Sequence, residues 1–163
     1  MTIYEIISTV ILVISLCINV YQFSARKPKL KIRISRSLEI DKNGVDTYLC
    51  ARIFISNYGS ETAYYSGIKA IDDQGELFFP SCSLGAKSEI PSNASIIGTI
   101  PSGHLLCHGT KKLIVIDGTL HEHRVPKRSL AEVILELKRE SVRLEKLNIQ
   151  AHPKNSCHYR KEM

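Results

Sequence analysis

The stretch "IISTVILVISLCINVYQFSARKPKLKIRIS", from Ile6 to Ser35, changes character abruptly in its middle. Residues 6–25 contain no charged side chain, and six lysines and arginines then follow between Arg26 and Arg36. A 20-residue helix is about 30 Å long, which matches the hydrocarbon thickness of a bilayer. A soluble helix of that length would normally carry a charged stripe. We therefore predict a transmembrane helix over residues 6–25.

A cleaved secretory signal is the main alternative for this segment. Such signals begin with basic residues and end with small residues at the cleavage site. Here the first five residues are Met1-Thr2-Ile3-Tyr4-Glu5, and the one candidate cleavage point, after Ala25, has Phe23 where a small residue is required. We therefore expect the helix to remain attached as a permanent anchor.

The charges beside the anchor predict its orientation. Lysines and arginines gather on the C-terminal side, whereas Glu5 and the α-amino group lie on the other, and the more basic side of a span faces the cytoplasm. This predicts that residues 1–5 lie outside and that the domain after the helix lies in the cytoplasm, at a cell inner membrane. The five cysteines include no CxxC pair, which suits a reducing compartment.

Two sets of residues in this region are candidates for contacts. The basic segment 26–36 merges into a first strand, because its Lys and Arg residues alternate with Leu30, Ile32 and Ile34. Its exposed cations are expected to contact anionic lipid headgroups: Arg26, Lys27, Lys29, Lys31 and Arg33. Four small or polar residues fall on one face of the anchor helix and are expected to contact another transmembrane helix, from a protein partner or a second copy: Ser8, Ser15, Asn19 and Gln22.

Residues 28–148 have the pattern of a mainly β domain. In "TYLCARIFISN" (residues 47–57) apolar residues alternate with others, as in a strand with one buried face. Further strands are expected in residues 62–71, 76–80, 94–100, 111–117 and 120–125, with turn residues between them. Residues 81–93 have the composition of a loop. This series of short strands predicts a β-sandwich.

The end of the chain follows a different period. Apolar residues recur at helical spacing after Ser129, which together with Glu132 fits a capping box. We predict a helix over about 129–147; a strand through "EVILELK" is the alternative, but the pattern is too long for one. Residues 149–163 are expected to form a disordered basic tail.

Two stretches carry a resemblance to a known class of protein. They are "ISNYGSETAYYSGIKAIDDQGE" (residues 55–76) and "IVIDGTLHEHRVPKRSL" (residues 114–130). With the anchor, they resemble small bacterial single-pass membrane proteins of unassigned function that carry an immunoglobulin-like β-sandwich. The resemblance implies that fold and a membrane location, and no site residues. Tryptophan is absent, so the chain lacks the Cys–Trp–Cys core of antibody domains.

Metal or thiol chemistry has one group of candidate residues. Cys and His are zinc ligands, and the chain gathers them in two places without the paired spacing of structural zinc sites: His104, Cys107 and His108 on a Gly-flanked loop, and His121 and His123 on a strand. No phosphate-binding glycine loop, nucleophile elbow or HExxH motif occurs. We therefore expect no cofactor and no metal.

The function expected from the sequence is a membrane-anchored, cytoplasm-facing binding or adaptor module without catalytic activity. The charge pattern does not favour a nucleic-acid partner, because the positive charge gathers at the two ends of the domain. Two alternatives remain open. One is a small membrane-tethered metal- or thiol-dependent enzyme that uses the His/Cys group, and the other is an accessory subunit that acts through its transmembrane helix.

Overall fold

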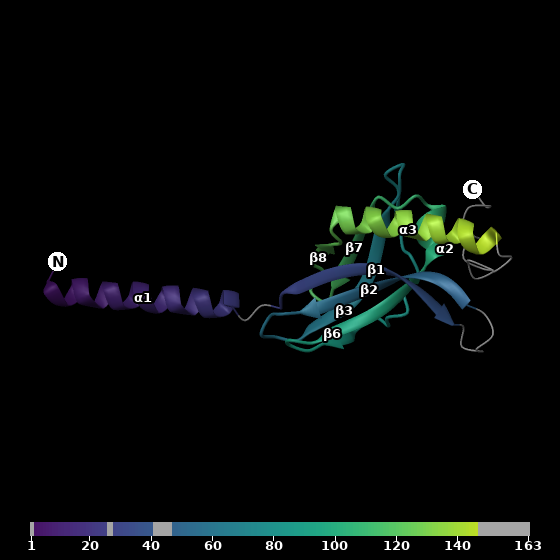
Figure 1. Cartoon of the computed structure of the whole chain (residues 1–163). Helices are drawn as coiled ribbons and strands as arrows, with labels where there is room; N and C mark the ends of the chain where they lie inside the picture. Colours follow the sequence, from purple (N-terminus) through teal and green to yellow (C-terminus); the bar gives the residue numbers. More distant parts are fainter. Residues whose placement is uncertain (1, 26–27, 41–46, 147–163) are drawn as a thin grey trace.

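The computed structural model describes residues 2–25, 28–40 and 47–146. Helix α1 (Ile3–Ala25) stands apart from the other elements, at the left of Figure 1. Its segment Ile3–Gln22 is long and apolar enough to cross a membrane, and none of it is buried within the protein. The helix expected over residues 6–25 is therefore present and begins at Ile3, since nothing in Ile3-Tyr4-Glu5 breaks a helix.

The first sheet contains three antiparallel strands in the order β1-β2-β6. Strands β1 (Leu30–Ile40) and β2 (Thr47–Asn57) pair over their whole length, and β6 (Ser95–Pro101) pairs with the other edge of β2. The alternation read from β2 is confirmed, because its inward side chains are almost wholly buried: Leu49, Ala51, Ile53 and Ile55.

The second sheet has the order β4-β3-β7-β8. Its strands are β3 (Ala63–Ile71), β4 (Leu77–Phe78), β7 (Lys112–Asp117) and β8 (Glu122–Arg124). The turn between β3 and β4 forms as its sequence predicts: an oxygen of Asp72 accepts hydrogen bonds from the N–H groups of Gln74 and Glu76, and Gly75 supplies a φ of 91°.

A short strand interrupts the segment expected to be a loop. Residues 81–93 include β5 (Ser88–Ile90), which pairs with β3 from Ala63↔Ile90 to Tyr65↔Ser88. The expectation of a continuous loop was wrong, because a three-residue strand is held by its partner's backbone and leaves no alternating pattern of its own. Beside this segment, Leu84 packs so tightly on Gly98 that an added Cβ would lie 2.7 Å from its Cγ.

Two helices complete the domain. Helix α3 (Lys127–Lys146) confirms the predicted C-terminal helix, but it begins before Ser129, so the capping box is wrong. Pro126 marks the start instead: its carbonyl accepts the N–H of Leu130 at 3.0 Å, and proline suits the beginning of a helix. Helix α2 (Ser102–Cys107) occupies the stretch expected to be a loop, and a single helical turn is too short to show a period.

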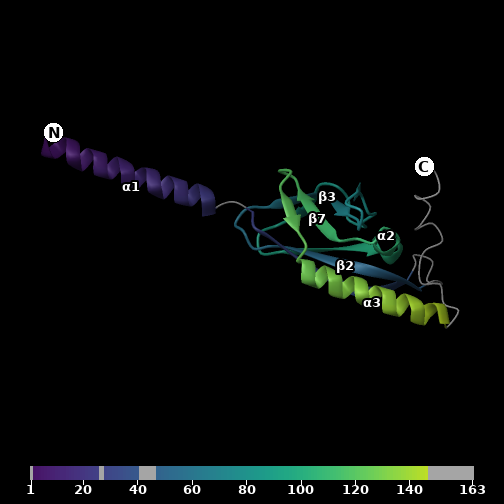
Figure 2. The same cartoon turned by 90° about the horizontal axis from the view of Figure 1, so that it is seen from above.

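Both sheets and α3 share one hydrophobic core, and Figure 2 shows α3 running alongside β2. Helix α3 lies beside β1 and β2 and contributes its apolar stripe to that core: Leu130, Val133 and Leu137. Within the described part of the chain, no residue of Ile3–Gln22 belongs to this core. An N-terminal apolar helix, antiparallel sheets and a C-terminal helix are therefore confirmed.

Asn57 is a polar group inside this core, with only 1% of its surface exposed. Its side-chain N–H groups donate to the carbonyls of Glu61, at 2.6 Å, and Ile90, at 3.0 Å. Its side-chain oxygen accepts the backbone N–H groups of Gly59, at 3.0 Å, and Lys29, at 3.3 Å. Asn57 thereby ties the residue that precedes β1 to β5 and to the turn after β2.

Candidate functional site

The polar face of α1 is fully accessible. The side chains of residues 3–22 are all exposed, and Ser8, Ser15, Asn19 and Gln22 fall within about 60° of one another around the helix axis. The described domain packs nothing against this face. Contact with another transmembrane helix stays a prediction.

The exposed basic residues after α1 form a row on β1. Lys29, Lys31 and Arg33 are exposed, and Lys31 and Arg33 lie beside Phe54 of the neighbouring strand. A shallow hollow of about 540 Å³ on this face is lined by Lys31, Arg33, Ile34, Ser35, Phe54 and Ser56. The other two predicted headgroup contacts, Arg26 and Lys27, lie outside the described residues. The row is accessible to an anionic surface, and its contact with lipid stays a prediction.

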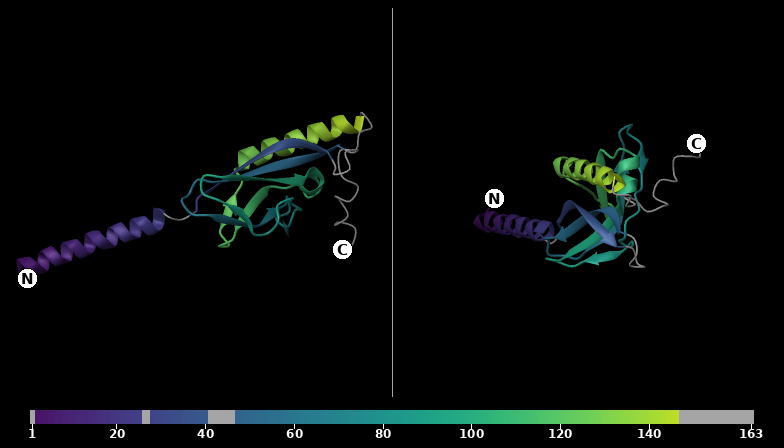
Figure 3. Two further views of the ribbon diagram at one scale, coloured as in Figure 1. Left: turned by 90° about the horizontal axis from the view of Figure 1, so that it is seen from below. Right: turned by 45° about the vertical axis from the view of Figure 1, so that its right-hand side comes forward.

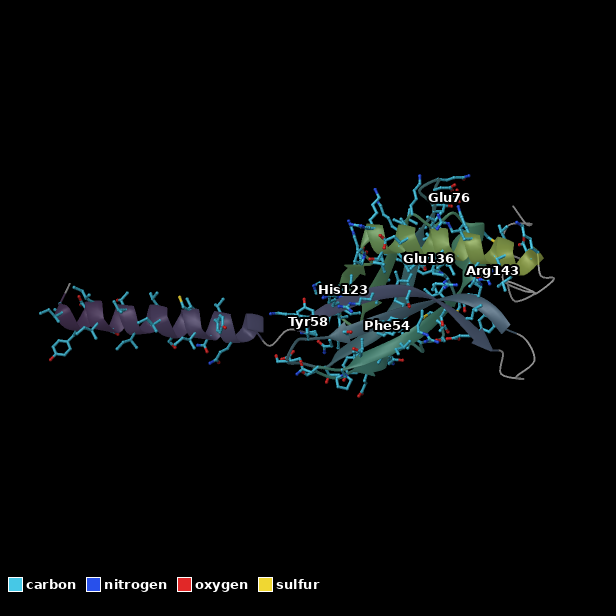
Figure 4. All side chains as sticks on the ribbon, in the orientation of Figure 1. Phe54, Tyr58, Glu76, His123, Glu136 and Arg143 are labelled. Atoms are coloured by element: carbon cyan, nitrogen blue, oxygen red, sulfur yellow. The ribbon has the colours of Figure 1, made fainter. Side chains whose placement is uncertain are left out.

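Arg36 has a different role from this row. Its guanidinium lies 3.2 Å from a carboxylate oxygen of Glu140 and 3.8 Å from one of Glu136, both on α3. Figure 4 shows Glu136 between α3 and β1. Arg36 falls on the same face of β1 as the buried Ile32 and Ile34, so period-2 alternation turns it toward α3. It joins β1 to α3.

Tyr58 was not singled out from the sequence. Its ring is 60% exposed at the end of the domain nearest α1 (Figure 4). Its backbone N–H donates to the carbonyl of Lys29 at 2.9 Å, so the tyrosine lies where the chain enters the domain. The signal that could have identified it is the Asn-Tyr-Gly turn, which projects an aromatic ring from a bend.

The histidines of the α2 region make structural contacts. His104 Nδ1 accepts the backbone N–H of Ser81 at 3.2 Å. Burial, and then the neighbouring His108, lower the pKa of His104. The ring of His108 stacks on Phe78 with their centroids 4.4 Å apart.

The other two histidines surround Asp117 in the β7–β8 hairpin. His123 Nε2 lies 2.7 Å from Asp117 Oδ2, and Asp117 Oδ1 accepts hydrogen bonds from the backbone N–H groups of His121 and Thr119 and from the hydroxyl of Thr119. Burial alone would raise the pKa of Asp117, but these hydrogen bonds outweigh it and hold the pKa below its ordinary value. Asp117 organises this turn, and its bonds to His123, His121 and Thr119 could not be predicted from its position in the Asp-Gly turn alone.

The His/Cys candidates therefore do not converge. Among residues 2–25, 28–40 and 47–146, no group of three His, Cys, Asp or Glu side chains is placed to hold a metal ion. Cys107 is disulfide-bonded, and the free cysteines in the described ranges are Cys17, Cys50 and Cys82. Burial, and then Glu39, raise the pKa of Cys50 to about 11, so this thiol is a poor nucleophile. The disulfide also removes support from the expectation of a reducing compartment, which now depends on the charges beside the anchor.

One feature that the sequence did not predict is a groove of about 880 Å³ between α3 and strands β7 and β8, which we call the α3 groove. Figure 3 shows α3 running along the domain from its start beside β8. Apolar side chains line the floor of the groove: Leu113, Val125, Leu130, Ile134 and Leu135. Basic side chains surround it: Lys111, Lys112, Arg124, Lys127 and Lys138. No Asp or Glu side chain lines it among the described residues.

Among the described residues these cations form no ion pair with a carboxylate, although Glu122 attracts Arg124 from nearby. Lys111 donates to the backbone carbonyl of Asp73 at 3.0 Å. The other four form no ion pair within the described ranges. The nearby carboxylates pair instead with cations outside the groove: Glu122 with Lys69, Glu132 with Arg128, and Glu136 with Arg36. The α3 groove is therefore a basic surface with an apolar floor.

Comparison with known proteins adds little. No protein-family model matches the chain, and no curated protein matches it. It is similar to a solved structure titled "X-ray structure of Northeast Structural Genomics Consortium target SoR45", with 14% sequence identity and a TM-score of 0.31. That match covers 59% of this chain and 80% of the other, and so low a TM-score supports no inference about function.

Proposed function

We propose that this chain is a single-pass membrane protein whose immunoglobulin-like domain faces the cytoplasm and acts as a binding or adaptor module. The observation that carries the proposal is the segment Ile3–Gln22 of α1, whose apolar side chains are all exposed beside a domain that closes its core without them. An exposed apolar helix of this length requires an apolar environment, and a bilayer provides one.

Strand order supports the immunoglobulin-like assignment. An immunoglobulin-type sandwich places strands A, B, E and D in one sheet and strands C, F and G in the other, and C′ extends the second sheet in variable-type domains. Read in chain order, β1-β2-β6 corresponds to A-B-E, and β4-β3-β7-β8 corresponds to C′-C-F-G. Strand β5 follows C′ in the chain as strand D would, but it pairs with β3 in the second sheet. Both sheets are antiparallel, as this fold requires.

The charges beside α1 support the inward orientation. Lys29 and Lys31 are exposed immediately after the helix, and Glu5 is the acidic residue in its first turn. Tyr58 lies at the same end of the domain, where an aromatic ring suits the headgroup region of a membrane. Each exposed cation near an anionic leaflet contributes about 1 kcal/mol to attraction.

Reporter fusions test this topology. A reporter that is active only in the cytoplasm, fused after Met163, is expected to be active, and an export-dependent reporter at the same site is expected to be silent. A variant that replaces Lys27, Lys29 and Lys31 with Gln and adds lysines before Tyr4 should shift activity toward the export-dependent reporter. An active export-dependent reporter on the unaltered chain would refute the cytoplasmic assignment.

Binding without catalysis is the proposed activity, because the candidate catalytic groups are occupied by structural contacts. His104 and His123 hold backbone and turn geometry, and Cys107 is disulfide-bonded. Zinc analysis of the purified chain tests the metalloenzyme alternative, and a stoichiometric metal would overturn the proposal. Pull-down with and without residues 1–27 separates partners of the domain from partners of the helix.

A further inference from the structure

The α3 groove combines a large apolar floor with basic walls. Its volume of about 880 Å³ is within the range of about 300–1,000 Å³ that is usual for ligand sites. Leu135 is 50% exposed at the edge of the floor. An occupant with apolar groups would cover this side chain.

The positions of the cations describe the shape of the occupant. Lys127 and Lys138 both lie on the α3 wall, eleven residues apart, which is about 16 Å along a helix. Lys112 and Arg124 lie on the opposite wall, at β7 and the end of β8. A lipid has its charge at one end, so it would satisfy one group of these cations. A segment with several carboxylates along its length would satisfy cations on both walls.

The chain's own C-terminal segment does not complement the groove. Residues 147–163 contain Lys154, Arg160 and Lys161 against Glu162, so their net charge has the same sign as the groove. Like charges disfavour that contact. Charge complementarity therefore points to a different chain.

We propose that the α3 groove binds a short acidic segment of a partner protein, in which apolar side chains fill the floor and flanking Asp and Glu residues pair with the basic walls. This proposal deepens the adaptor function proposed above and rests on it, since it names the class of partner. The apolar contacts would supply most of the affinity, and the charge pairs would select acidic over basic segments.

A designed peptide provides the probe. The full chain, in nanodiscs of uncharged phosphatidylcholine, is titrated into a fluorescent 16-residue helical peptide that has a leucine stripe flanked by glutamates, and anisotropy reports binding. A second peptide carries lysines in place of the glutamates. The acidic peptide is expected to bind, more weakly as salt rises, and the basic peptide is expected to bind at least about tenfold more weakly.

Two matched variants locate the binding site. Lys127→Glu with Lys138→Glu reverses the charge of the α3 wall and is expected to weaken binding of the acidic peptide by about tenfold or more. Arg128→Glu with Arg139→Glu has the same spacing, on the same helix, with the same change of charge, but lies outside the groove. This control pair is expected to change binding by less than about twofold. Unchanged thermal melting of both variants excludes a folding defect.

Three outcomes would overturn the proposal. In the first, the two variant pairs weaken binding of the acidic peptide equally. In the second, the acidic and basic peptides bind equally well, and in the third, the acidic peptide does not bind. Displacement of the peptide by short-chain phosphatidylglycerol, with the same dependence on Lys127 and Lys138, would assign the groove to lipid and also overturn it. The topology reporters do not depend on the groove, so failure here is distinguishable from failure of the membrane assignment.

Discussion

Replacing Asn57 with alanine is expected to destabilise the domain by about 3–4 kcal/mol. The substitution removes four hydrogen bonds that join Lys29, Gly59, Glu61 and Ile90 through one side chain. Each such bond contributes about 1 kcal/mol net, and a buried carbonyl left without a donor costs about 1–3 kcal/mol. The full cost of about 1–3 kcal/mol does not apply to all four backbone groups, because those near the surface can hydrogen-bond to water once the side chain is removed. The free energy of unfolding of a small domain is about 5–15 kcal/mol in total, so this substitution would remove a large part of it.

Urea unfolding of a fragment spanning residues 28–163, which keeps every cysteine after the anchor helix, measures this loss. The fragment contains every residue of the hydrophobic core and is expected to be monomeric and to unfold cooperatively. Asn57→Ala should lower the urea midpoint with an unchanged slope. Gln74→Ala, in an exposed turn, is the control and should change stability by less than about 0.5 kcal/mol.

Asn57→Asp adds a sharper test of the same geometry. Aspartate keeps an oxygen for the N–H groups of Lys29 and Gly59, but it places a second oxygen against the carbonyls of Glu61 and Ile90. The buried carboxylate should therefore have a raised pKa, and stability should partly recover as pH falls and the group protonates. If Asn57→Ala and Asn57→Asp both matched the Gln74→Ala control, the assigned role of Asn57 would be refuted.

Three further outcomes are expected. Asp117→Asn should lower the urea midpoint most near pH 7, and the difference in midpoint from the wild type should narrow below about pH 4. The pKa of Asp117 is lower in the folded protein than in the unfolded chain, so its carboxylate stabilises the fold above the unfolded pKa and loses that contribution when it is protonated. A difference in midpoint that does not depend on pH would contradict this. Gly98→Ala should lower the free energy of unfolding by about 1–3 kcal/mol in the same assay, because an added Cβ overlaps neighbouring side chains. An unchanged stability would show that those side chains can move aside. Asn19→Leu and Ser15→Leu should each reduce self-association or partner association of residues 1–27 in a membrane two-hybrid assay; unchanged signals in both would leave α1 as a tether.

Elements with a strong local pattern were predictable from the sequence, and elements defined by their neighbours were not. Strand β2 alternates because one face packs on the core, and α1 was recognisable because residues 6–25 contain no charged side chain. Helix α2 and strand β5 are too short to show a period, and they form because other backbones hold them. The start of α3 was misplaced because Ser129 and Glu132 resemble a cap, whereas Pro126 sets the boundary.

The candidate sites were harder to predict because they depend on contacts between distant segments. The apolar positions of α3 indicate which face of that helix is buried, but they do not reveal that β7 and β8 lie beside Lys127 and Lys138. The histidine pairs could be found in the sequence, but their hydrogen-bond partners could not, because Asp117 approaches His123 only when the hairpin forms. Asn57 could be recognised as a turn residue, while its bond to the carbonyl of Ile90 crosses from one sheet to the other.

The position of each cation in the basic segment decides what it can do. Along an extended strand each residue adds about 3.3 Å, so Arg36 lies about 23 Å farther along β1 than Lys29. Electrostatic attraction to a membrane surface falls off over about 8–10 Å in physiological salt. If β1 leads away from the membrane, as the proposed topology requires, the electrostatic attraction to the lipid headgroups is strongest at Lys29 and Lys31. Arg36 is beyond their reach and instead pairs with Glu136 and Glu140. One run of basic residues thus serves both the membrane contact that we propose and the attachment of α3, and that attachment leaves the opposite face of α3 free to form the groove.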